Sequence, residues 1–263
     1  MFSFDKFVNT VYEHFLETDV TQDEIFKILD LKEDYNKDSP HSTGKRLKLK
    51  RLKILGEKDQ NLYINYDKEI ADGINVWIAD NFKGKSSIFK VVKFALTGNN
   101  DLKEDVKGWI HEVFLEFELG NSYCIYISNP KGSRIKGGMY KLDIDKLIKI
   151  KSNSENSIDE LSIVFEFNNN LEFKNLVQEF FFQQLSYYTL KWTQKSSQKD
   201  NLGLNEAKTS WDTYFKSIYL ESKDYNTLFL AQDYGNQGQK IFEMILGLKF
   251  TYPINRLKIR RDY

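Results

Sequence analysis

The sequence has little of what builds disulfide-linked, metal-binding or membrane proteins. Its 263 residues include one cysteine, Cys124, and three widely separated histidines, His14, His41 and His111. A single cysteine excludes a disulfide framework and any multi-cysteine metal site, and scattered histidines do not predict a zinc cluster. No hydrophobic run approaches the roughly 20 residues that a membrane helix needs.

An excess of charge of either sign is also missing. The chain has 38 basic and 38 acidic residues, so its formal net charge is zero. A protein that coats nucleic acid through bulk positive charge would need a strong basic excess. The first twenty residues lack the basic start and apolar centre of a signal peptide. We therefore expect a soluble cytoplasmic protein without membrane contacts.

What the sequence does contain is a large apolar fraction. Hydrophobic residues make up 41% of the chain, which excludes disordered and collagen-like proteins. A chain of this length can bury roughly 70–75% of its extended surface in one large domain with a small annex. From changes of charge and pattern we expect a helical extension over 1–44, a lobe over 45–150 and an α+β part over 151–263.

The charge reverses sharply within the first sixty residues. Residues 1–40 carry a net charge of −6 and residues 41–58 a net charge of +6. The basic stretch alternates like a β-strand, and a change of parity between Lys50 and Arg51 predicts a β-bulge. Its basic side chains could follow DNA phosphates or lie near a nucleotide, or they could form a solvated face paired with residues 1–40. These side chains are Lys45, Arg46, Lys48, Lys50, Arg51 and Lys53.

The most informative stretch is GINVWIADNFKGKSSIFKVVKFALTG, residues 73–98. Residues 74–79 are apolar on both faces, which is typical of a central strand in a sheet covered by helices. Residues 88–96 place apolar side chains at helical spacing, and Gly98 can end that helix. Between the two lies a loop that ends in Gly-Lys-Ser at the predicted helix start.

Gly84-Lys85-Ser86 occupies the position that these residues take in a phosphate-binding loop. Free N–H groups and the helix dipole attract anions, and Gly84 lets the backbone approach a phosphate. Lys85 would reach the β- and γ-phosphates, and the Ser86 hydroxyl would ligate Mg²⁺. A chance Gly-Lys-Ser that caps an ordinary helix is the alternative, since Ala79 replaces the first glycine of the motif. The candidate binding residues of the loop are Asp80, Asn81, Phe82, Lys83, Gly84, Lys85, Ser86 and Ser87.

This stretch resembles the ABC-type ATPase heads of SMC, RecF and related coiled-coil DNA-repair proteins. Asn81 in the third place of the loop, Ser86-Ser87 after the lysine and the helix end Ala95-Leu96-Thr97-Gly98 carry the resemblance. The order of basic strand, second strand, loop, helix and antiparallel hairpin extends it over about residues 45–130. Residues 171–250, with Trp192, Trp211 and the helix around Ile241-Phe242, resemble coiled-coil ATPases of bacterial defence operons.

The resemblance implies an α/β fold, a P-loop lobe with a mixed central sheet and an antiparallel β-subdomain. It implies ATP and Mg²⁺ as cofactors, a second ATPase lobe or head as a dimer partner, and DNA as a further partner. A partner subunit from DNA repair or anti-phage defence is also implied. Gln183, or its neighbour Gln184, would take the place of the family's glutamine at the γ-phosphate, although aromatic neighbours favour packing at a lobe junction.

The chain departs from the family at several places. Ala79 and Phe82 stand where glycines are usual, and Lys83 replaces a small residue. The family also needs a signature motif and an apolar strand that ends in Asp-Glu. LFLAQD at 228–233 imitates that strand, with Asp233 as metal partner, but lacks the glutamate; GNQGQK at 235–240 imitates the signature loop on the wrong side of it.

We therefore expect the amino-terminal lobe of a head, which binds ATP but needs a second lobe to hydrolyse it. One alternative is a non-catalytic assembly subunit with a degenerate P-loop fold. Another is a different P-loop enzyme, such as a kinase or GTPase, although the guanine-reading Asn-Lys-x-Asp is missing. For the rest of the chain we predict strands at 62–66, 161–167 and 215–220, a hairpin at 110–128, a strand and helix at 139–150, helices at 171–185 and 237–248, and a polar loop at 193–208.

Overall fold

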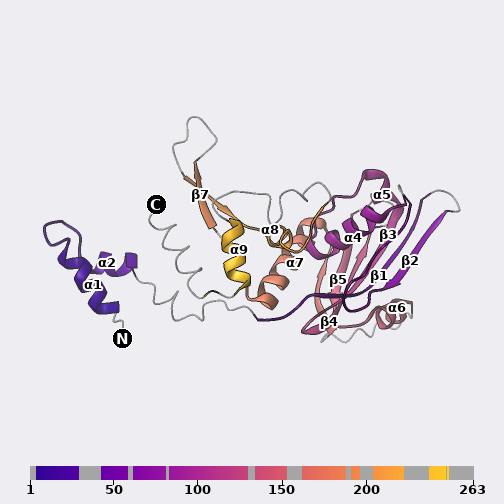
Figure 1. Ribbon diagram of the computed structural model, residues 1–263, viewed down its shortest axis with the longest axis horizontal. Helices are drawn as coiled ribbons and strands as arrows, with labels where there is room; N and C mark the ends of the chain where they lie inside the picture. The colour runs from indigo at the N-terminus through magenta and orange to yellow at the C-terminus, as the bar shows by residue number, and fades with distance from the viewer. Residues whose placement is uncertain are drawn as a thin grey trace. The chain divides into compact units, whose positions relative to one another are not determined.

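The computed structural model in Figure 1 describes most of the chain. The described residues fall into two compact units, each treated separately below. The first unit holds the described parts of 1–42, 188–209 and 232–263, and the second those of 43–187 and 210–231. The described residues are 4–29, 43–58, 62–80, 83–129, 134–152, 162–187, 191–195, 204–221, 237–246 and 248.

The first unit contains three helices and a hairpin among its described residues: α1 Phe4–Glu13, α2 Gln22–Leu29, α9 Gln237–Ile245, and strands β7 Lys191–Lys195 and β8 Leu204–Lys208. α1 and α2 confirm the helical start of the chain, and they bury Val8 and Ile25. Thr21 caps α2 in a capping box, because its hydroxyl accepts from the Glu24 backbone N–H at 3.3 Å and its own N–H donates to the Glu24 carboxylate at 2.9 Å. The polar loop predicted at 193–208 is wrong at both ends, where β7 and β8 pair antiparallel.

The second unit is built on a six-stranded sheet in the order β2-β1-β3-β4-β5-β6. All five pairings are antiparallel. The α/β class is therefore confirmed, whereas the predicted mixed sheet is wrong for the described residues. The hairpin and the strands at 62–66 and 161–167 are also confirmed. The strands are β1 Lys48–Glu57, β2 Tyr63–Glu69, β3 Ile110–Leu119, β4 Asn121–Ser128, β5 Lys136–Tyr140 and β6 Ile163–Phe167.

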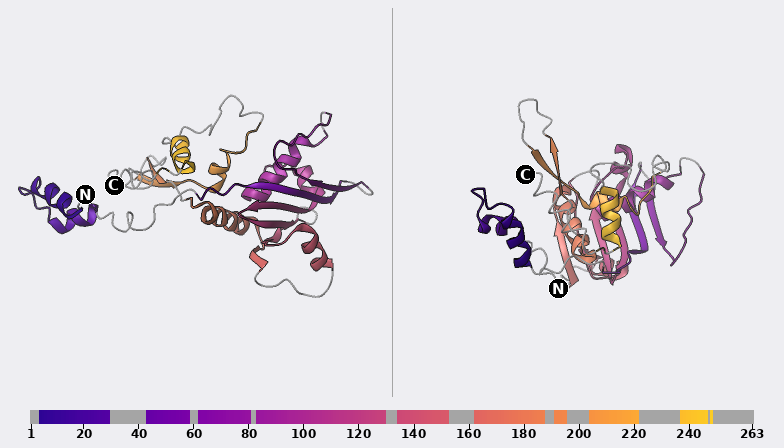
Figure 2. Two further views of the ribbon diagram at one scale, coloured as in Figure 1. Left: turned by 60° about the horizontal axis from the view of Figure 1, so that its bottom comes forward. Right: turned by 60° about the vertical axis from the view of Figure 1, so that its left-hand side comes forward.

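Helices cover both faces of this sheet, as Figure 2 shows for α4 above it and α6 below it. The helices are α4 Lys85–Thr97, α5 Glu104–Trp109, α6 Ile144–Ser152, α7 Asn170–Leu185 and α8 Trp211–Phe215. Side chains along β3 alternate between the two faces of the sheet. Phe117 stacks on Phe181 of α7 on one face, and Phe114 packs on the other face in a cluster with Ile144 and Leu147 of α6. The strand predicted at 215–220 is wrong, because Trp211, Tyr214 and Phe215 follow the helical spacing of α8.

α4 is anchored in this core by its carboxyl-terminal half only. Residues 91–97 are buried, and the indole N–H of Trp211 donates to the Leu96 carbonyl oxygen at 2.7 Å. The helix ends at Gly98, whose φ of 73° is left-handed. A Cβ at Gly98 would lie 2.7 Å from the Lys174 Cα, so only glycine fits between α4 and α7.

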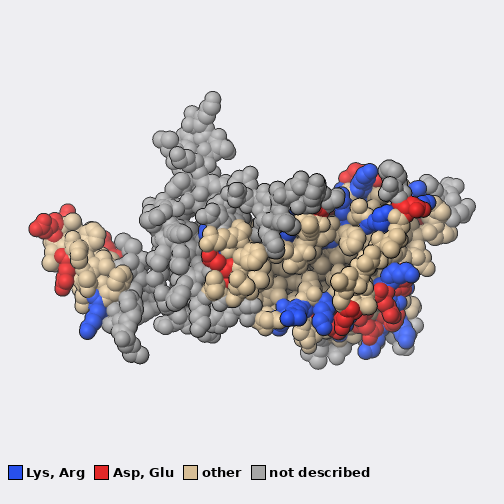
Figure 3. Space-filling model, in the orientation of Figure 1, with Lys and Arg blue, Asp and Glu red and all other residues tan. Residues whose placement is uncertain are grey.

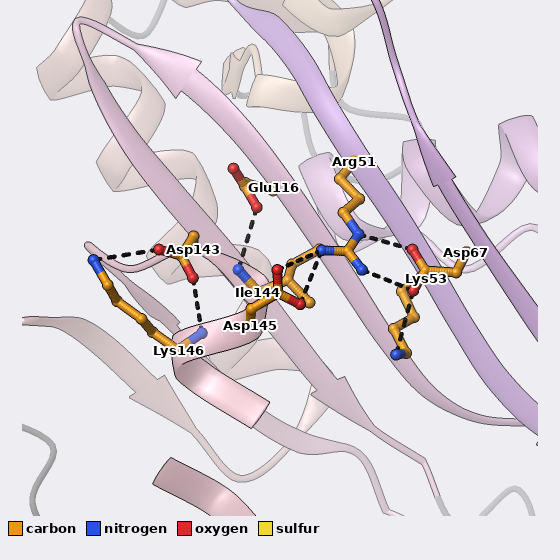
Figure 4. A network of polar contacts seen from close by, with 8 residues as sticks. All are labelled: Arg51, Lys53, Asp67, Glu116, Asp143, Ile144, Asp145 and Lys146. Carbon is orange, nitrogen blue, oxygen red and sulfur yellow. Dashed lines mark hydrogen bonds and ion pairs between the residues drawn. The ribbon is translucent and has the colours of Figure 1, made fainter. Parts of the chain in front are cut away.

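The edge of the sheet is held by charge rather than by apolar packing. β1 shifts its register between Leu49 and Arg51, which confirms the predicted bulge. Arg51 makes two hydrogen bonds to Asp67 of β2, at 2.8 and 2.9 Å, and a third contact, at 3.0 Å, to Asp145 of α6 (Figure 4). One guanidinium therefore ties two strands and a helix together.

We predict that Gly98→Ala lowers the free energy of unfolding by about 2–5 kcal/mol, because it adds left-handed strain to a backbone clash. Gly44→Ala is the matched control, since Gly44 has φ 65° and open space around it. Gly44→Ala should lower the free energy of unfolding only by the left-handed strain, about 1–2 kcal/mol. Urea denaturation followed by circular dichroism measures both values. Equal losses in the two variants would contradict the close approach of α4 to α7.

We predict that Arg51→Met lowers the free energy of unfolding at pH 7 by about 1–3 kcal/mol, because the carboxylates of Asp67 and Asp145 lose their hydrogen bonds to the guanidinium. The Arg51 hydrogen bonds hold the pKa of Asp67 below its ordinary value. The ionised carboxylate therefore stabilises the fold above about pH 4, and this contribution is lost as the pH falls through the lowered pKa. The difference between wild type and Arg51→Met should thus shrink on acidification.

Lys48→Met is the control for this experiment, because the Lys48 side chain is 48% exposed and its ammonium lies 4.0 Å from the Asp72 carboxylate. It should change stability by less than about 0.5 kcal/mol. Denaturant curves between neutral and acidic pH provide the comparison. A loss in Arg51→Met that stays constant with pH would show that Asp67 does not depend on Arg51.

Candidate functional site

The loop before α4 ends in a free helix amino-terminus. Gly84 has φ 82°, which is the left-handed conformation, and no side chain caps the helix. The first backbone hydrogen bond of the helix runs from the Ile88 N–H to the Gly84 carbonyl at 3.0 Å. In the described part of the chain, the N–H groups of Lys85, Ser86 and Ser87 therefore have no backbone acceptor. Such groups, together with the helix dipole, attract anions.

The Lys85 side chain folds back across this loop. Its ammonium donates to the carbonyl oxygen of Asp80 at 2.8 Å and to that of Ala79. The ammonium therefore lies against the backbone that precedes the helix. The arrangement brings a cation and the free N–H groups of the first helical turn to the same short loop.

The loop is open on its outer side. A Cβ built at Gly84 meets nothing within 4 Å, so the glycine is needed for its φ rather than for space. Lys83 and Ser86 are exposed, and Ser87 is half-buried. Ser86 is therefore exposed to solution at the start of the helix. Asn81 and Phe82, the two other predicted residues of the loop, lie outside the described residues.

The segment before the loop differs from the prediction of a buried central strand. Residues 74–79 form no strand and pair with none of the strands in the described ranges, so that prediction is wrong there. Ile74, Val76 and Ile78 are 95%, 74% and 91% exposed, so one face of the segment is bare. The other face rests on the body, where the Trp77 indole N–H donates to the Tyr66 hydroxyl at 2.6 Å.

Among the described residues, Gln183 makes no hydrogen bond to the loop before α4. It lies near the end of α7, where its side-chain amide donates to Glu179 at 3.1 Å. Gln184 instead accepts a hydrogen bond from the Lys45 ammonium at 2.8 Å. Asp80 is exposed beside Lys85. The structure thus brings Asp80 and residues 83–87 together, and the role of Gln183 stays a prediction.

The basic strand is neutralised by acids of its own unit. Lys50 lies 3.3 Å from Asp72 and 3.4 Å from Glu118, and Lys53 lies 3.3 Å from Asp67. Basic and acidic side chains accordingly alternate on the surface in Figure 3 and do not form a continuous basic patch there. The contacts support a paired, solvated strand face, and the predicted pairing with residues 1–40 stays a prediction.

The site has no ready-made cluster of metal ligands. Among the described residues, no group of three or more histidine, cysteine, aspartate or glutamate side chains could hold a metal ion. A Mg²⁺ ion at this loop would depend on the Ser86 hydroxyl and on oxygens of a phosphate ligand. The predicted metal partner, Asp233, lies outside the described residues. Of the predicted signature loop, residues 237–240 form the first turn of α9.

No protein-family model and no curated protein matches the sequence. The likeness to SMC and RecF heads therefore rests on the residues quoted above. Within the described ranges, no helix has the length and hydropathy to cross a membrane.

Sequence reasoning missed three residues beside the loop: Phe89, Lys90 and Ile218. They line a groove that reaches Ser86. Phe89 and Lys90 follow the Gly-Lys-Ser motif by one helical turn, so helix geometry could have placed them on the Ser86 side. No local signal points to Ile218, because it comes from a segment more than a hundred residues further along.

Proposed function

We propose that this chain binds ATP with Mg²⁺ and forms the amino-terminal lobe of an SMC/RecF-like ATPase head. In this proposal the head acts on DNA, in repair or anti-phage defence. The observation that carries the proposal is the fold-back of Lys85 onto the Asp80 carbonyl at 2.8 Å, beside the first turn of α4, whose N–H groups have no backbone acceptor among the described residues. A cation next to a free helix start is what a nucleotide's phosphates require.

Each group of the loop has a task in this proposal. The triphosphate replaces the backbone carbonyls as the partner of Lys85, since charge-assisted bonds to phosphate are stronger than bonds to neutral carbonyls. The N–H groups of Lys85, Ser86 and Ser87 donate to phosphate oxygens. The Ser86 hydroxyl is a hard oxygen ligand for Mg²⁺, which would neutralise charge on the β- and γ-phosphates.

The bare segment before the loop supports the need for a second lobe. Alternating apolar side chains with a free backbone edge form a template for another strand. Ile74, Val76 and Ile78 offer such a face. LFLAQD at 228–233, which imitates the family's Asp-Glu strand, lacks the glutamate that would activate water. We therefore expect the chain to bind ATP without turning it over by itself.

A non-catalytic assembly subunit is the second candidate. The same exposed face favours it, because an unpaired apolar strand serves assembly whether or not nucleotide binds. Ala79 in place of the motif's first glycine points in the same direction. The two candidates differ in a single property, which is the binding of nucleotide at the loop before α4.

We predict micromolar binding of ATP·Mg²⁺ to the wild-type chain and a loss of at least about 30-fold in Lys85→Ala, the factor that corresponds to one charge-assisted hydrogen bond. Isothermal titration calorimetry measures both affinities. Lys68→Ala, which removes an exposed lysine of β2, should leave the affinity unchanged. If wild type does not bind, the assembly subunit becomes the better proposal.

We further predict that saturating ATP·Mg²⁺ converts the chain from monomer to dimer, because heads of this kind associate through bound nucleotide. Sedimentation velocity with and without nucleotide measures the change. Lys85→Ala should remain monomeric under both conditions. A dimer that forms equally without ATP would favour assembly through the bare segment 74–79 instead.

A further inference from the structure

A groove of about 800 Å³ lies directly beside the loop. It follows α4 from Ser86 in the first turn to Leu96 in the last turn. One further wall comes from residues 46–49 at the start of β1. The other comes from residues 215–221, which begin at the last residue of α8. Small-molecule sites in proteins commonly occupy about 300–1,000 Å³, so the groove is large enough for a ligand of nucleotide size.

The lining of the groove is apolar and aromatic with a basic rim. Leu47, Leu49 and Val92 contribute aliphatic surface, and the aromatic side chains are Phe89, Phe215 and Tyr219. Arg46 and Lys90 add two cations. A mostly apolar surface with a few polar groups is the usual composition of a site for a planar organic ring.

The wall opposite α4 is fixed by a buried ion pair. The Lys93 ammonium lies 3.3 Å from the Glu221 carboxylate and 5.6 Å from the centre of the Tyr219 ring. Burial by itself would lower the pKa of Lys93, but its bonds to Asp101 and Glu221 raise the pKa overall. The lysine therefore stays charged and holds residues 219–221 against α4. The groove is a built feature rather than a gap between loose segments.

We infer that this groove receives the base and ribose of the nucleotide whose phosphates bind at the start of α4. The inference rests on the proposed function and adds the site for the nucleoside half of the ligand. Ser86 belongs to both the loop and the groove, so the two sites are continuous. Lys90 also lines the groove, where its ammonium donates to the Asp101 carbonyl oxygen at 3.2 Å.

The aromatic walls give the base its contact area. Phe89 is 42% exposed, and Phe215 stacks on Tyr219 with ring centres 5.5 Å apart. A purine ring between such side chains buries apolar surface that inorganic phosphates cannot bury. Affinity for ATP should therefore exceed affinity for a triphosphate without a base.

The test compares ATP·Mg²⁺ with inorganic tripolyphosphate·Mg²⁺ by calorimetry on the full chain. We expect wild type to bind ATP roughly five- to hundredfold more tightly, the range that corresponds to stacking one base on an aromatic side chain. Ile218→Trp should fill the groove and reduce ATP affinity to that of tripolyphosphate. Because Ile218 is 62% exposed, the larger side chain should not disturb the core.

Tripolyphosphate binding is the internal control for folding and for the loop, and it should be the same in Ile218→Trp and wild type. Leu171→Trp is the matched control, since Leu171 is 69% exposed on α7 and does not line the groove. Equal binding of ATP and tripolyphosphate by wild type would overturn the groove as nucleoside site while keeping the loop. Binding of neither ligand would instead overturn the proposed function itself.

Discussion

The burial of one half of α4 is the constraint on which the rest of the second unit depends. Phe94, Ala95 and Leu96 are at most 3% exposed, and Trp211 clamps the Leu96 carbonyl. Helix rigidity carries this anchoring over the remaining turns, so the burial of one half also fixes where the helix begins. The loop, the bare segment and the groove are all positioned by this one helix.

Local pattern was sufficient wherever a single element determined the structure. The period of residues 88–96 placed α4, alternation placed β1 and β3, and Gly-Asn at 120–121 placed the hairpin turn. The Gly-Lys-Ser tripeptide marked the helix start at Lys85. Periodicity and turn residues encode such elements directly, and the free helix amino-terminus follows from the helix itself.

Prediction was wrong where the structure depends on distant partners. The apolar pattern of 74–79 predicted a buried strand, yet burial needs a neighbouring strand that the described residues do not supply. The strand predicted at 215–220 was wrong, because the packing of α8 on α7, through Trp211 and Phe181, cannot be read locally. The groove could not be predicted for the same reason, since its walls come from three separate parts of the chain.

Phe89 connects the two features that the proposals explain separately. Its ring lines the groove beside Ser86, and its edge meets Trp77 at 5.4 Å between ring centres. Trp77 lies on the inner face of the bare segment, opposite to Val76 and Ile78. A strand that pairs with this segment would press on Trp77, and a base in the groove would press on Phe89 from the other side. Under the proposed function, a second lobe and a nucleotide therefore act on one aromatic contact, which makes partner docking and nucleotide binding energetically dependent on each other.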